Sequence, residues 1–264
     1  MDVSFKFLIA MFFMQISFAQ AQGFSTWGQS KKYLECLDIV AADNVGAVAT
    51  AREWYIGGGG VAAQHCEALA LYEQERYGEA AELFETVVGK LSRDEDVNDF
   101  ANQNEKILKL QLNYMAGISW HSANEFDKAY NALSAAIVGL EDKSQYAYDL
   151  FIKRGLVQIS TKAYENAAQD FGRALEINSA KVDAFLFRAE SYRQLNQHLK
   201  ARLDLNAALS LEPDNPDVLF ESGVNYRMQH NDEKALVEWE KLIKKYPDTY
   251  WQKLVEDNIG LIGK

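Results

Sequence analysis

The sequence predicts an all-α protein made of repeated helical hairpins. The first observation is a pattern that recurs five times, in which an alanine is followed four and seven residues later by further apolar residues. The second is the regular distance between these alanines. The third is composition: only 3 prolines interrupt a chain that is 48% hydrophobic and 25% charged, which is typical of a folded protein and leaves long stretches free to form helices.

The N-terminus predicts a secretory signal peptide over residues 1–21. A weakly charged start ends at Lys6, a nearly uninterrupted apolar run covers residues 7–18, and Ala19 and Ala21 are the small residues that a signal peptidase reads. A run of about a dozen residues is too short to span a bilayer. We therefore expect an exported protein with no stable membrane insertion. Gln22 follows the cleavage point, so a lipid anchor would have no cysteine there.

The two cysteines that follow, Cys36 and Cys66, predict a single disulfide in an oxidising compartment. Closing a loop of about 30 residues contributes about 3 to 4 kcal/mol in the chain-entropy model. The alternative is a pair of buried free thiols, because spacing alone does not bring the two Cβ atoms together. Around Cys36, residues 31–40 and 44–55 predict two helices, which form a degenerate N-terminal pair within residues 22–60.

The repeated pattern places its members on one face of a helix, because residues four and seven positions apart share a helical face. The alanines are Ala80, Ala129, Ala167, Ala201 and Ala235, and the large residues four positions later are Phe84, Leu133, Phe171, Leu205 and Trp239. The steps between successive alanines are 49, 38, 34 and 34 residues. Such a repeat predicts one structural unit used several times.

A period of 34 residues makes residues 61–249 resemble the tetratricopeptide repeat (TPR) family. The first helix of each unit carries the small residue that the family prefers, followed three positions later by an aromatic: Gly117 and Trp120, Ala189 and Tyr192, and Gly223 and Tyr226, while Gly155 is followed by Gln158. Pro213 and Pro247 stand at the closing positions of two repeats. The resemblance implies a right-handed superhelical solenoid with a concave inner face.

The expected repeats are residues 61–94, 110–143, 148–181, 182–215 and 216–249. Their small residues should let two antiparallel helices approach closely while the aromatic fills the space between them. Residues 250–264 should form a capping helix, because the last hairpin needs a cover. In such a stack the first and third helices lie side by side, which suits a disulfide between Cys36 and Cys66.

The glycine run of the stretch WYIGGGGVAAQHC is interpreted as a turn between helices. A nucleotide-binding loop would need a lysine and a hydroxyl residue after the glycines, and neither follows. We expect Gly57 to end one helix in the left-handed region and the next helix to begin near Val61. The stretch also resembles the start of exported TPR proteins of Gram-negative bacteria, which implies helix packing there and a periplasmic location.

The sequence predicts no metal site, cofactor or catalytic set. Its 4 histidines lie in different repeats, and none has a partner at metal-ligand spacing. Residues 94–99 with Glu105 follow the order of a calcium loop, but Asp99 stands where a glycine should turn the chain. A helix beginning near Asp96 explains this acidic stretch better. The carboxylates are otherwise scattered and no G-x-S-x-G motif occurs, so we expect no enzyme.

A net charge of −11 and a pI near 4.9 argue against nucleic acid as a ligand and favour a basic partner. In the resembled family, the first helices line the groove that holds the partner. This implies the partner-groove residues Tyr114, Ile118, Ile152, Leu156, Leu186, Arg193, Phe220, Val224 and Arg227. The apolar members have two open interpretations: a binding strip, or packing between neighbouring first helices.

The charged positions of the first helices complete the expected surface. Arg193 and Arg227 share position twelve and should orient a carboxylate of the partner. An aspartate recurs at position two, as Asp149, Asp183 and Asp217, and is expected to complement the helix dipole. The predicted function is a non-catalytic protein–protein interaction module in the bacterial envelope, which binds a protein or peptide segment in its groove. The alternative is a regulatory subunit or assembly factor of a cell-wall or outer-membrane enzyme complex that docks by an outer face.

Overall fold

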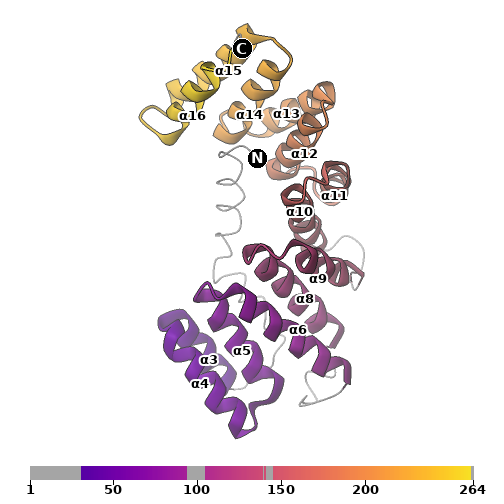
Figure 1. The fold of residues 1–264 in the computed structure, drawn as a ribbon, viewed down its shortest axis with the longest axis vertical. Helices are drawn as coiled ribbons and strands as arrows, with labels where there is room; N and C mark the ends of the chain where they lie inside the picture. The colour runs from indigo at the N-terminus through magenta and orange to yellow at the C-terminus, as the bar shows by residue number, and fades with distance from the viewer. Residues whose placement is uncertain (1–30, 94–104, 139, 141–144, 263–264) are drawn as a thin grey trace. The chain divides into compact units, whose positions relative to one another are not determined.

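The computed structural model describes residues 31–93, 105–138, 140 and 145–262, and every element in these ranges is helical. The expected signal peptide and residues 94–104 of the calcium-loop pattern lie outside the described residues. The chain divides into two compact units, residues 1–142 and 143–264, called unit 1 and unit 2 below. Each unit is a stack of antiparallel helical hairpins (Figure 1).

The helices of unit 1 form the expected N-terminal pair and two further hairpins. They are α3 (Lys31–Ala42), α4 (Asn44–Trp54), α5 (Gly60–Glu73), α6 (Tyr77–Arg93), α8 (Glu105–Ser122) and α9 (Phe126–Val138). Ala47 and Ala51, the close-packing positions of α4, are fully buried. Helix α8 starts five residues before the expected repeat boundary at residue 110, so this repeat has a longer first helix than the 34-residue pattern predicts.

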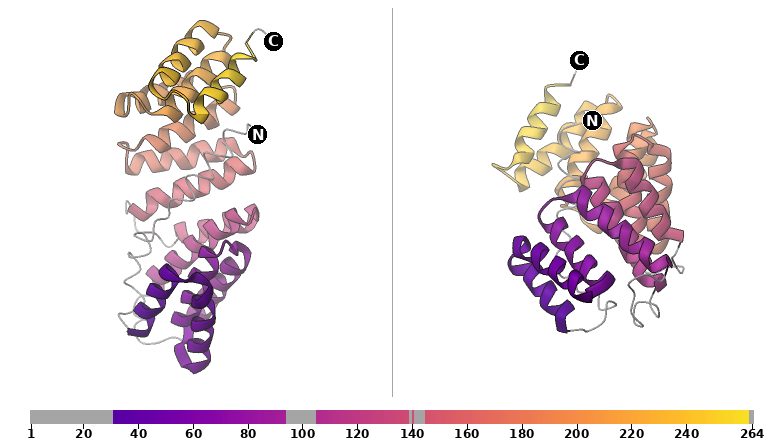
Figure 2. Two further views of the ribbon diagram at one scale, coloured as in Figure 1. Left: turned by 90° about the vertical axis from the view of Figure 1, so that its left-hand side faces the viewer. Right: turned by 60° about the horizontal axis from the view of Figure 1, so that its bottom comes forward.

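The helices of unit 2 form three hairpins and a final helix, as the repeat pattern predicts. They are α10 (Gln145–Ser160), α11 (Tyr164–Ile177), α12 (Val182–Gln194), α13 (His198–Leu211), α14 (Pro216–Met228), α15 (Asp232–Lys245) and α16 (Tyr250–Ile259). Figure 2 shows these helices running back and forth in pairs, in orange to yellow. The Asn215 side chain caps α14 by accepting a hydrogen bond from the Val218 amide, and Pro216 occupies the first turn.

The glycine run ends α4 by a turn, but one residue later than expected. The helix continues through a π-helical turn over Tyr55–Gly59, which delays its end. Gly58, not Gly57, takes the left-handed conformation, with φ of 90°, and Gly60 also has a positive φ of 55°. Both conformations favour glycine, which explains why several glycines follow one another. The next helix, α5, begins at Gly60.

A disulfide joins Cys36 of α3 to Cys66 of α5 across a Cα–Cα distance of 6.4 Å. Both cysteines are buried, and these two helices lie against one another. Beside the disulfide, the Tyr33 hydroxyl and Nδ1 of His65 form a buried hydrogen bond of 2.8 Å. Burial lowers the pKa of His65 to about 3. The N-terminal pair is therefore fixed to the first repeat by a covalent bond and by a buried polar contact.

Small residues bring the two helices of each hairpin close together. A Cβ added at Gly155 would lie 2.5 Å from the Phe171 ring, and one added at Gly223 would overlap the Trp239 indole even more. Phe171 and Trp239 are fully buried. The sequence interpretation is confirmed here, because the aromatic side chain occupies the space that a methyl group would otherwise fill.

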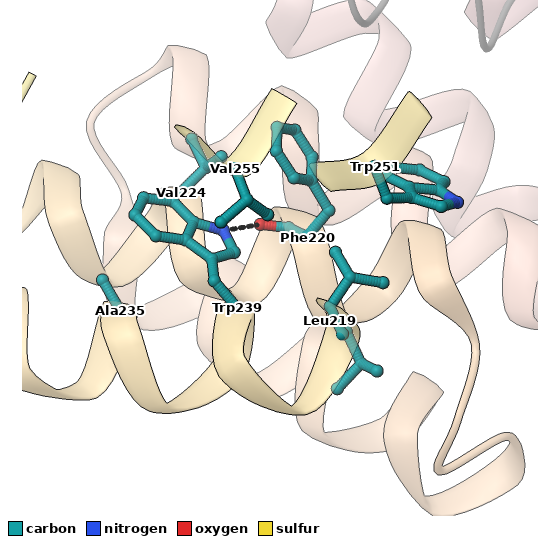
Figure 3. Packing of buried hydrophobic residues seen from close by; sticks show 8 residues of the cluster. Leu219, Phe220, Val224, Ala235, Trp239, Trp251 and Val255 are labelled. Atoms are coloured by element: carbon teal, nitrogen blue, oxygen red, sulfur yellow. Dashed lines mark hydrogen bonds between the residues drawn. The ribbon is translucent and has the colours of Figure 1, made fainter. Parts of the chain in front are cut away.

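The core at the C-terminal end of unit 2 comes from three helices. Phe220 of α14 packs beside Trp239 of α15 and Trp251 of α16, with ring centroids 6.5 and 5.6 Å apart. The Trp239 indole donates a hydrogen bond of 3.1 Å to the Phe220 carbonyl, as Figure 3 shows. Trp251 and Val255 of α16 are buried in this cluster. Helix α16 therefore covers the last hairpin, which confirms the expected capping helix over the described residues to 262.

Candidate partner-binding surface

The first helices of unit 2 lie next to one another, α10 against α12, α12 against α14, and α14 against α16. The second helices α11, α13 and α15 contact one another less. Since the chain packs more tightly on the side of the first helices, this side is the inner side of the stack. The candidate surface of unit 2 consists of the residues that α10, α12 and α14 present there.

Most apolar members of the predicted groove are buried. Ile118 of unit 1 and Ile152, Leu156, Phe220 and Val224 of unit 2 are each at most 4% exposed. Only Tyr114 in unit 1 and Leu186 in unit 2 are partly exposed. Of the two interpretations left open by the sequence, the burial of these five residues favours packing between neighbouring helices. They do not form an open apolar strip, because side chains at these positions fill the space between successive first helices.

Arg193 is part of a buried ion-pair network instead of facing a partner. Its Nε atom donates to Glu221 of α14, and its Nη2 atom donates to Glu190, one turn earlier, at 2.9 Å. All three side chains are buried. The expectation that Arg193 orients a partner is therefore corrected: removing a guanidinium that neutralises two buried carboxylates would be expected to destabilise unit 2.

Arg227 remains a candidate for partner contact. It is partly exposed on α14, and within the described part of the chain its Nε atom is buried without a hydrogen-bond partner. A bound carboxylate or carbonyl could accept that hydrogen bond. The structure thus separates the two arginines of position twelve, although the sequence gave them the same role.

The aspartates of position two are partly exposed in all three first helices of unit 2. Asp183 accepts a hydrogen bond from the Tyr148 hydroxyl. Lys153, a buried residue that the sequence analysis did not single out, lies near Asp149 and Asp183, whose charges oppose the lowering of its pKa to about 8 by burial. Asp217 has no such lysine, because its own helix has Glu221 at the position of Lys153.

Paired charges repeat on the other side of the first helices and stabilise the hairpins. Arg154 of α10 forms two hydrogen bonds to Asp170 of α11, and Arg188 of α12 forms the same two to Asp204 of α13, all between 2.6 and 2.8 Å. Each pair spans 16 residues. These bidentate contacts fix one helix of a hairpin to the other.

The described residues suggest no other type of site. Among them, no three His, Cys, Asp or Glu side chains gather as metal ligands would. None of the helices in the described ranges has the length and apolar character required to cross a membrane. The inner side of unit 2, with its carboxylates and Arg227, is therefore the best candidate for recognition of a partner.

Comparison with known proteins agrees with this architecture. Residues 182–215 and 217–249 each match a family model described as the tetratricopeptide repeat. These matches coincide with the hairpins α12–α13 and α14–α15. The chain is a TPR protein. Solenoids of such repeats bind other proteins through extended surfaces, so the TPR chain is a protein-interaction module.

The TPR chain is similar to two human proteins over a small part of their length. It is 24% identical to sperm-associated antigen 1 of Homo sapiens over 205 residues, which are 71% of this chain and 22% of that protein. It is 31% identical to protein unc-45 homolog B of Homo sapiens over 91 residues, 34% of this chain and 10% of that protein. The chain therefore spans about a fifth or less of the length of these relatives.

Solved structures share the fold at low sequence identity. A tetratricopeptide repeat protein from Parabacteroides merdae is 17% identical with a TM-score of 0.66, and covers 88% of this chain and 87% of its own. PilF of Pseudomonas aeruginosa is 16% identical with a TM-score of 0.60, over 86% and 96% of the two chains. YrrB, a TPR protein with an unusual peptide-binding site, is 18% identical with a TM-score of 0.55, over 74% and 91%.

Proposed function

We propose that this TPR protein is a non-catalytic module that binds a segment of a partner protein on the inner side of unit 2. The observation that carries the proposal is the row of partly exposed aspartates at position two of α10, α12 and α14, together with Arg227. Neighbouring helices are about 8 to 10 Å apart, which matches about three residues of an extended chain. A partner segment would be recognised by its charges, because the apolar positions of this side are buried.

The location belongs to the same proposal. The apolar N-terminal run and the small residues at Ala19 and Ala21 support export, and a buried disulfide between Cys36 and Cys66 is consistent with an oxidising compartment such as the periplasm of a Gram-negative bacterium. Mass spectrometry of the protein from fractionated cells would test this. A mature N-terminus at Gln22 in the periplasmic fraction is expected, whereas an intact Met1 in the cytoplasm would refute export.

A second candidate function is docking by an outer face to an enzyme complex of the envelope. Leu199 and Leu203 of α13 lie one helical turn apart and are 79% and 69% exposed, so they form an apolar pair on a second helix. Exposed apolar side chains in adjacent positions are a usual feature of protein interfaces. This candidate predicts a partner that recognises the outside of unit 2.

One experiment compares the two surfaces. The tagged wild type, an inner-side variant (Leu186→Ala with Arg227→Ala) and an outer-side variant (Leu199→Ser with Leu203→Ser) would be cross-linked in cells, and captured proteins would be quantified. Loss of a captured partner only in the inner-side variant supports the first proposal, and loss only in the outer-side variant supports the second. Wild-type protein that captures nothing above an untagged control would contradict both.

A further inference from the structure

Asp217 differs from its equivalents in the surroundings of its carboxylate. Asp149 and Asp183 have Lys153 near them, and Asp183 also accepts a hydrogen bond from Tyr148. In the described part of the chain, no basic side chain forms an ion pair with Asp217. One turn later on α14, Glu221 is occupied by Arg193 of α12. Asp217 is thus a partly buried carboxylate for which the fold supplies no cation.

The helix dipole does not compensate for this. Asp217 lies in the first turn of α14, where the dipole stabilises negative charge and where its own backbone amide donates a hydrogen bond. Burial nevertheless raises the pKa of Asp217 to about 6. The desolvation of the carboxylate therefore exceeds the local stabilisation, and a cation at this point would favour the charged form.

An aromatic ring lies beside the carboxylate. Tyr250, at the start of α16, is 41% exposed and close enough for the charge of Asp217 to raise its pKa. The ring of Trp251 packs against Tyr250, with centroids 4.5 Å apart, and against Phe220. The Trp251 ring supports that of Tyr250, which leaves part of the Tyr250 side chain open to solvent. A carboxylate next to a supported aromatic ring is the environment in which proteins bind ammonium and guanidinium groups.

We propose that Asp217 and the ring of Tyr250 form a binding site for one lysine or arginine side chain of the partner protein. The site rests on the proposed function, because it lies on the inner side of unit 2, and it adds the chemistry of the partner. The cation would form an ion pair with Asp217 and lie against the ring of Tyr250. A protein with a net charge of −11 would also attract a basic segment from a distance.

The test measures the titration of Asp217 itself. The carboxyl carbons of isotope-labelled protein would be followed by NMR from pH 4 to 8 in 150 mM salt. The first sample contains a trilysine peptide with blocked ends, and the second contains the same peptide with its side chains acetylated. With trilysine, the pKa of Asp217 should fall saturably by about one unit or more. Asp257, an exposed residue of α16, is the matched control and should shift far less, since nonspecific attraction acts on all carboxylates.

Two variants test the ring. Tyr250→Phe should keep most of the trilysine-dependent shift, and Tyr250→Ala should lose at least half of it. Equal shifts at Asp217 and Asp257, or equal effects of the plain and acetylated peptides, would overturn the inference. These outcomes are separate from the proposed function: a partner captured equally by wild type and by Asp217→Asn would refute the cation site alone, whereas failure of the wild type to capture any partner leaves the titration able to decide.

Discussion

Gly223 lets α14 approach the Trp239 indole more closely than any other residue would permit. An added methyl group would overlap the ring, and the indole cannot move freely because its nitrogen is bonded to the Phe220 carbonyl. We therefore expect Gly223→Ala to lower the free energy of unfolding by about 1 to 3 kcal/mol, measured by urea denaturation. Gly78→Ala is the control, since the nearest listed neighbour of its Cβ would be 3.9 Å away. Equal stability of Gly223→Ala and wild type would mean that the indole yields.

His65 makes the stability of unit 1 depend on pH. Its pKa is lowered to about 3 by burial, so the folded chain keeps it neutral while the unfolded chain takes up a proton near pH 6.5. The associated stability is fully present above about pH 6.5 and is lost progressively as the pH falls toward 3. Relative to pH 8, the loss at pH 5 should be about 2 kcal/mol.

The measurement is a comparison of denaturation curves at pH 8 and pH 5. His65→Gln can keep a hydrogen bond to Tyr33 but cannot be protonated, so its stability should fall by about 2 kcal/mol less than that of the wild type between these two pH values. His230→Gln, at an exposed position, is the control and should behave as the wild type does. Parallel losses in wild type and His65→Gln would show that other groups dominate the acid sensitivity.

At the scale of the elements, the turn inside each hairpin has a feature that the sequence does not reveal. One residue between the first and second helix has a positive φ, between 56° and 62°, and none of these residues is glycine: they are Glu75, Asn124, Lys162, Asn196 and His230. They follow one another at the same steps as the alanines of the repeat. The left-handed conformation costs about 1 to 2 kcal/mol for most residues, so each turn retains some strain.

Glycine should relieve that strain. Lys162→Gly and His230→Gly are expected to raise the free energy of unfolding by about 0.5 to 1 kcal/mol, after the entropy that glycine loses on folding is subtracted. Both positions are exposed, so few contacts would be lost. Asn196→Gly should change little, because asparagine tolerates this conformation. Thermal denaturation would measure all three, and a loss of stability in Lys162→Gly would show that its side chain contributes more than the turn costs.

The fold could be predicted because the repeat is written in residue size. An alanine or glycine opposite a large side chain, as at Gly155 and Phe171, determines where two helices meet, and this information is local. The burial of Ile152 or Phe220 was left open, because it depends on how closely one hairpin approaches the next. The environment of Asp217 also depends on this approach: Tyr250 lies 34 residues after Pro216, but only the packing of α16 brings it to the carboxylate.

For the whole molecule, stability in a repeat stack comes from each hairpin and from its contacts with the next, so a local loss should fade with distance along the stack. The disulfide provides the test, because it joins α3 to α5 at one end of the chain. A double variant, Cys36→Ala with Cys66→Ala, should lose about 3 kcal/mol in the N-terminal hairpins. Amide hydrogens of α3 to α5 would then exchange about 100-fold faster, while those of α14 to α16 keep the wild-type rates. A uniform acceleration in all helices would show instead that the chain unfolds as one cooperative body, in which the disulfide stabilises the partner-binding side as much as its own hairpins.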